Sequence, residues 1–182
     1  MKPKIIAILG LVCLSTSQIL MTNGFDFLQS QRPVDFAHWL MLIGAVCLTA
    51  FCFVFPKSIF SRIATPLIIL GAIAHVGMCA IDFVLWSFGE DYEGRNQLIG
   101  QLINTPVIWL PFMVIGPALL YTGLSLFGWA YVKRYTLYSI LVLLGTSAVG
   151  IGQMVLRSPE VVAIGCVVFS IGLAMLANKV GE

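Results

Sequence analysis

Two ionisable residues, His75 and Asp82, lie inside the otherwise apolar stretch 72–88. On a helix that rises about 1.5 Å per residue, they are about 10.5 Å apart along the axis and lie on one stripe. This separation is too long for a direct hydrogen bond, so water or a third side chain would have to connect them. A histidine and a carboxylate placed in this way predict a site that binds a small polar solute or a proton.

The carboxylate of Asp82 is the stronger indication of a site. A charged side chain costs about 2.5 to 3.5 kcal/mol at the centre of a membrane-spanning helix, so it usually faces a cavity or a partner. We expect Asp82 to lie about 9 Å below the outer interface of the membrane. The alternative is a structural ion pair that ties helices together, for which the sequence offers Arg157, Arg95 and Arg32.

Polar residues near the outer ends of two other apolar segments are predicted at the depth of Asp82. Gln18 belongs to the first segment, and Gln153 precedes Arg157 by one helical turn in the fifth. If the helix faces that carry Gln18, Gln153 and Asp82 converge, they form a polar pocket open to the outside, with His75 as its floor near the midplane. The alternative is that the glutamines only hold helices together, at an average gain of about 0.6 kcal/mol. The predicted ligand or proton site comprises Asp82, His75, Gln18, Gln153 and Arg157.

The elements that must position these residues follow from the composition. The chain is 59% hydrophobic and only 10% charged, with a mean hydropathy of +0.99, which is typical of a multi-pass membrane protein. A span needs about 20 apolar residues. We predict an all-α integral membrane protein, a six-transmembrane-helix bundle with short loops, in one domain over residues 1–182, without a soluble catalytic module or a nucleic-acid-binding face. The predicted spans are 5–23, 37–55, 63–88, 106–132, 136–156 and 160–178.

The lysines and arginines predict the orientation, because positively charged loops stay cytoplasmic. Most of them fall on one set of alternate loops, at Lys2, Lys4, Lys57, Arg62, Lys133, Arg134 and Lys179. The N-terminus and the C-terminus are therefore both predicted to be cytoplasmic. The basic start and apolar middle of the first segment also resemble a signal peptide, but "STS" lacks an A-x-A pattern, so we expect the helix to be retained. A bacterial inner membrane is the expected location.

The outer loop 89–105, "GEDYEGRNQLIGQLINT", is first acidic and then amphipathic. Its apolar residues fall on one side of a helix and its amides on the other, which predicts a short helix on the outer interface. It could cover the pocket that contains Asp82 as a lid. The simpler interpretation is a re-entry segment that leads into the fourth span.

No cofactor, no metal and no catalytic residue is predicted. His38 lies at the outer entrance of the second span and is expected to be an interfacial residue, at a depth about 18 Å from that of His75. One haem iron therefore cannot take both histidines, and no zinc motif is present. The five cysteines form no C-x-x-C pair and are expected to be packing residues.

Small residues in the fourth and fifth spans predict close helix packing. Gly116 and Gly123 lie in the fourth span, and Gly145, Gly150 and Gly152 lie in the fifth. Glycine lets helix backbones approach each other closely in a membrane. We expect these residues to form a compact bundle, or a contact between two copies in a homo-oligomer.

Three functions are compatible with this pattern. The first is a carrier, channel or binding protein for a small polar solute or a proton, with its polar site in the outer half of the bundle. The second is a noncatalytic membrane component, such as an assembly factor, a sensor or a subunit bound to a membrane partner protein, whose polar residues only hold helices together. The third, an intramembrane enzyme, would need a second acid or a nucleophile beside Asp82, and the sequence indicates none. In each case the lipid bilayer is the immediate partner.

Overall fold

The computed structural model describes residues 2–31 and 33–180, and its regular elements there are all helical. Within these residues, six helices are long and apolar enough to cross a membrane. This confirms the predicted all-helical class and the prediction of six long apolar helices that could span a membrane. The long helices are α1 (Pro3–Met21), α3 with η1 (Phe36–Leu48, Thr49–Phe53), α4 (Ile59–Ser87), α6 with η2 and α7 (Pro106–Trp109, Leu110–Ile115, Gly116–Ala130), α8 with η3 (Thr136–Ile151, Gly152–Leu156) and α9 (Pro159–Val180).

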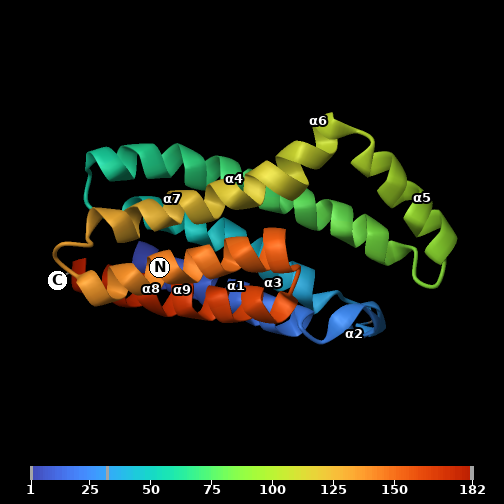
Figure 1. Ribbon diagram of the computed structural model, residues 1–182, viewed down its shortest axis with the longest axis horizontal. Coiled ribbons are helices and arrows are strands. Elements are labelled where there is room, and N and C mark those ends of the chain that lie inside the picture. The colour runs from blue at the N-terminus through green and yellow to red at the C-terminus, as the bar shows by residue number, and fades with distance from the viewer. Residues whose placement is uncertain (1, 32, 181–182) are drawn as a thin grey trace.

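The six long helices are arranged as a closed ring. Helix α1 packs against α3 and α9, α9 against α8, α8 against α7, α7 against α4, and α4 against α3. The most extensive contacts join three antiparallel pairs, α1 with α3, α4 with α7, and α8 with α9. Figure 1 shows both chain ends toward one end of the bundle, while α2 (Gly24–Ser30) and α5 (Tyr92–Ile103) lie at the other.

Helix α4 begins earlier than the predicted span 63–88 because it has a complete capping box. The Ser58 hydroxyl accepts a hydrogen bond from the backbone N–H of Ser61 at 3.1 Å, and the Ser61 hydroxyl accepts one from the Ser58 N–H at 2.7 Å. These bonds satisfy backbone donors that the first turn leaves without a partner. The 29-residue helix is therefore about 44 Å long, which exceeds the hydrocarbon thickness of about 30 Å.

Glycines allow the backbones of each helix pair to touch. A Cβ atom on Gly145 in α8 would lie 2.4 Å from the backbone nitrogen of Phe169 in α9, and one on Gly71 in α4 would lie 2.3 Å from that of Leu120 in α7. Gly44 in α3 approaches the α1 backbone in the same way. Each of the three pairs therefore depends on a position where no side chain fits.

The predicted close packing is confirmed for most of the glycines named from the sequence. Added Cβ atoms on Gly116, Gly123, Gly145 and Gly152 would each meet a neighbouring helix within 3.0 Å. Gly150 meets nothing within 4 Å, so it does not pack against a neighbouring helix of the bundle. Its side of α8 faces outward, because the helical period separates it from the stripe that contacts α9.

Two shorter helices lie at the end opposite the chain ends. The predicted amphipathic segment forms α5, whose first turn is capped by Asp91 through a 2.9 Å bond from the Gly94 N–H. Helix α2 was not predicted. It follows a sharp turn at Gly24, where φ is +85°, and the indole N–H of Trp86 on α4 donates to the Leu28 carbonyl at 3.3 Å.

Candidate functional site

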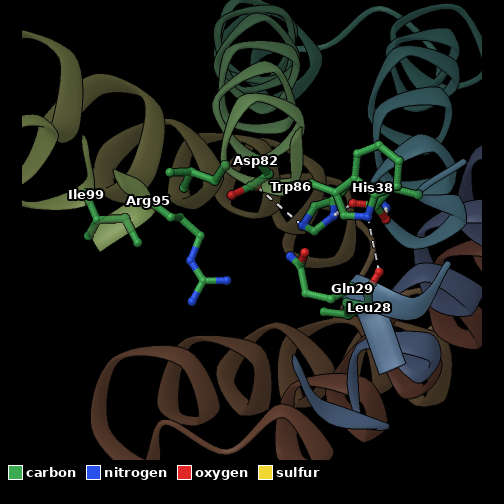
Figure 2. A pocket seen from close by; sticks show the side chains of 9 residues that line it. Leu28, Gln29, His38, Asp82, Trp86, Arg95 and Ile99 are labelled. Carbon is green, nitrogen blue, oxygen red and sulfur yellow. Dashed lines mark hydrogen bonds and ion pairs between the residues drawn. The ribbon is translucent and has the colours of Figure 1, made fainter. Parts of the chain in front are cut away.

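A cavity of about 350 Å³ opens at the α2 and α5 end of the bundle, and we call it the outer cavity because the sequence predicts that this end faces outward. Four elements supply its walls, namely α2, α4, α5 and the start of α3. Figure 2 shows the polar heads of residues from these elements directed toward one space. The lining residues are Leu28, Gln29, Asp35, His38, Asp82, Leu85, Trp86, Arg95 and Ile99.

Asp35 starts α3 and fixes the histidine that follows it. One carboxylate oxygen accepts the backbone N–H of His38 at 3.2 Å, which caps the helix. The other accepts from Nδ1 of the His38 ring at 2.5 Å. Asp35 is only 2% exposed, so this charge-assisted bond is shielded from solvent. The residue thereby sets both the start of α3 and the orientation of the imidazole.

The other ring nitrogen of His38 faces Asp82. Its Nε2 lies 3.5 Å from the Asp82 carboxylate, across the contact between α3 and α4 (Figure 2). When Nδ1 donates to Asp35, Nε2 is left as an acceptor that faces the Asp82 carboxylate, so a proton or a donor group can lie between them. We call the arrangement Asp35–His38–Asp82, in which an imidazole lies between two carboxylates, the acid–imidazole triad.

The remaining polar residues of the outer cavity come from the two short helices. Gln29 on α2 has a buried Oε1 atom without a hydrogen-bond partner among the residues that the structure describes. Arg95 on α5 extends its guanidinium into the same space and stacks over the Tyr92 ring at 5.2 Å. The walls between these groups are apolar, which strengthens electrostatic interactions with a bound molecule.

Of the five residues in the predicted site, only Asp82 lines the outer cavity. His75 is 2% exposed, and its Nδ1 donates to the Gly71 carbonyl one turn earlier at 3.0 Å. Gln18 is half-buried, and its amide contacts the Met41 sulfur at 3.6 Å. Both residues lie in packed helix contacts, where their polar groups have partners within the bundle.

Gln153 lies on η3, a π-helical turn that ends the fifth span, and Arg157 is the C-cap of that turn. Both side chains are exposed, and Arg157 ends the helix with a left-handed φ of +51°. Neither lines the outer cavity. Within the described part of the chain, the helix face that carries Gln153 and Arg157 therefore does not converge with the face that carries Asp82.

The alternative interpretation of Asp82 was an ion pair with an arginine, and the ion-pair contact that the structure gives for it is with His38. Among the predicted arginines, Arg95 shares the cavity with Asp82, Arg157 does not line it, and Arg32 lies outside the described residues. His38, expected to be an interfacial residue at the entrance of the second span, lies in the first turn of α3 and also contacts Asp82. The packing of the start of α3 against the last turns of α4 brings Asp82 to the level of His38.

The sequence indicates no second acid beside Asp82, whereas in the structure Asp35 lies on the other side of the same imidazole. The signal for it was the spacing Asp35-x-x-His38, which places a helix-capping carboxylate beside a side chain one turn into the helix. Gln29 and Arg95 gave no comparable signal, because only the fold brings α2 and α5 to the end of α4.

The described lining provides hydrogen-bonding groups, charges and a proton-accepting triad, without a hydroxyl, thiol or amine side chain. In the described ranges, no group of three histidine, cysteine or acidic residues is placed to hold a metal ion. The chemistry that this set supports is therefore recognition of a polar molecule together with proton exchange.

The six apolar helices indicate a multi-pass integral membrane protein in contact with a lipid bilayer. Comparison of the chain with known protein families, curated proteins and solved structures finds no match. Any more specific function must therefore be argued from the outer cavity itself.

Proposed function

We propose that this protein is a carrier or binding protein that takes a small polar solute into the outer cavity. The observation that carries the proposal is the Asp82 carboxylate, whose side chain is 20% exposed and whose contact with the His38 ring is as long as 3.5 Å. A carboxylate accepts about four hydrogen bonds, so Asp82 keeps acceptor capacity for a solute. A volume of about 350 Å³ is at the small end of the range for ligand pockets.

The acid–imidazole triad gives this site a way to couple solute and proton. A solute that donates a hydrogen bond to Asp82 takes the acceptor position that a proton between His38 and Asp82 would otherwise occupy. Solute binding and proton binding then compete for the same oxygen atoms. By linkage, such a solute binds with release of a proton.

The second candidate function is a noncatalytic membrane component, and one observation favours it. The contact between His38 and Asp82 joins α3 to α4, and Asp35 also caps α3. The same contacts that could serve a ligand therefore also hold helices together. The two functions differ in what an isosteric change at Asp82 does, because Asp82→Asn keeps the size of the side chain and removes its charge.

The experiment that separates them is a thermal unfolding screen of the purified protein in detergent. The panel contains inorganic ions, sugars, amines, amino acids and lipids at millimolar concentration. We expect at least one compound to raise the unfolding temperature of the wild type, because a ligand that binds only the native state stabilises it. We expect Asp82→Asn to stay folded and to lose that response.

The matched control is Glu90→Gln, which removes an exposed carboxylate from the turn between α4 and α5, at the same end of the helix bundle. It should respond to the compound as the wild type does. If no compound stabilises the wild type, and Asp82→Asn alone lowers the unfolding temperature, the triad is a structural contact and the second candidate function holds.

The proposal also requires that the outer cavity face outward, with both chain ends cytoplasmic in a bacterial inner membrane. We expect Glu90→Cys to react with a membrane-impermeant maleimide on intact cells, and Lys133→Cys to react only after lysis. Both variants are made in a background in which alanine replaces the native cysteines, which are Cys13, Cys47, Cys52, Cys79 and Cys166. The reverse pattern would place the cavity on the cytoplasmic side.

A further inference from the structure

The outer cavity presents opposite charges from different elements. Asp82 extends from α4 and Arg95 from α5, and Figure 2 shows their charged groups directed into the cavity from separate positions. Asp82 contacts the His38 ring at 3.5 Å. A guanidinium has five N–H donors, so Arg95 can bind an anionic group while it keeps its contacts with the protein.

Two uncharged residues of the cavity, Gln29 and Trp86, complement the acceptor oxygens of Asp82. The Oε1 atom of Gln29 is buried and accepts no hydrogen bond from the described residues, and a buried acceptor left without a donor is destabilising. A donor group on a bound molecule would satisfy it. The Trp86 ring, held by its bond to the Leu28 carbonyl at 3.3 Å, provides a flat apolar wall beside this position.

These features select between classes of solute. A simple cation suits Asp82 and Gln29 but is repelled by Arg95, whereas a simple anion suits Arg95 and is repelled by Asp82. A molecule with one cationic and one anionic group satisfies both sides. We propose that the solute of the outer cavity is a small zwitterion, whose ammonium group binds Asp82 and Gln29 and whose carboxylate binds Arg95. This inference rests on the proposed function.

The test compares probes that differ only in their charged groups. The first set is 4-aminobutyrate, butylamine and butyrate, and the second is glycine, β-alanine and 6-aminohexanoate, which vary the distance between the charges. Binding to the full chain in detergent is measured by isothermal titration calorimetry. We expect the best zwitterion to bind at least about tenfold more tightly than butylamine or butyrate, because each charged hydrogen bond contributes more than a neutral one.

Two variants assign the charges to their residues. We expect Arg95→Gln to weaken zwitterion binding by about tenfold or more and to leave butylamine binding unchanged or stronger, since a repulsive charge is removed. Asp82→Asn should abolish binding of both. Arg95→Lys keeps the charge and should recover part of the affinity. Arg62→Gln, which removes an exposed arginine at the other end of α4, is the matched control and should bind as the wild type does.

The outcomes separate the solute class from the proposed function. Equal binding of butylamine and 4-aminobutyrate by the wild type would overturn the proposal of a zwitterionic solute and leave Asp82 as a binding site for amines. Binding of a sugar or an inorganic ion that depends on Asp82, without binding of any amino acid, would overturn the class and retain the function. If no probe in either screen binds, both the class and the function are wrong.

Discussion

Replacement of Asp35 with alanine is expected to lower the free energy of unfolding by about 3 kcal/mol or more, because two contacts of a buried carboxylate are lost together. Asp35 is 2% exposed. It caps α3 through the His38 N–H and binds the His38 ring through Nδ1. Without it, a donor of the first turn and a ring nitrogen are left without an acceptor. The measurement is unfolding by sodium dodecyl sulfate in mixed micelles.

A second substitution divides this loss into its parts. Asp35→Ser keeps a side-chain oxygen that can cap the helix but removes the charge. We expect it to recover about 1 kcal/mol of the loss and to leave the part that belongs to the imidazole contact. In the background of His38→Phe, the two substitutions at position 35 should then differ only by the cap. If Asp35→Ala unfolds as the wild type does, the buried carboxylate is not a structural partner of His38.

The long helices could be predicted from sequence because hydrophobic length alone specifies them. A run of about 20 apolar residues has one stable form in lipid, the helix, since every backbone polar group must be satisfied within the segment. Helix ends are less well specified. The start of α4 depends on the reciprocal bonds of Ser58 and Ser61, and the short α2 depends on the distant contact of Trp86 with Leu28.

The candidate site was less predictable than the helices. Asp82 could be identified because a carboxylate in an apolar run is costly wherever it lies. His38 and Asp35 lie at a helix start, where polar residues are common, so their residue types alone do not indicate a functional site. Their contact with Asp82 depends on how α3 and α4 are placed relative to each other. A count of residues along each helix gives depths but not this relative placement.

The position of the outer cavity follows from how the helix pairs are joined. Helix α4 packs tightly against the span formed by η2 and α7. Gly71 of α4 meets Leu120 of α7, and Gly77 of α4 meets Phe112 of η2. Beyond this contact α4 runs away from α6, and α5 connects their ends (Figure 1). The last turns of α4, which carry Asp82, are thereby free to meet α3 and α2. The cavity forms where the tight packing of the pair ends.

Tight packing at glycine predicts the second large effect on stability. Gly145→Leu in α8 is expected to lower the free energy of unfolding by roughly 3 kcal/mol, at the upper end of the usual cost of overpacking. A Cβ atom there would lie 2.4 Å from the backbone nitrogen of Phe169. Backbone atoms of a helix cannot move aside as a flexible side chain can, so α8 and α9 must separate along their contact.

The matched control for this prediction lies on the same helix. Gly150→Leu adds the same side chain to α8 at a position where a Cβ atom meets nothing within 4 Å, and it should unfold within about 0.5 kcal/mol of the wild type. Both variants have the same composition and nearly the same hydropathy, so the difference between them reports only the contact with α9. Equal unfolding free energies in mixed micelles would show that α8 and α9 do not pack through Gly145, and the closed ring of six helices would then be wrong at this pair.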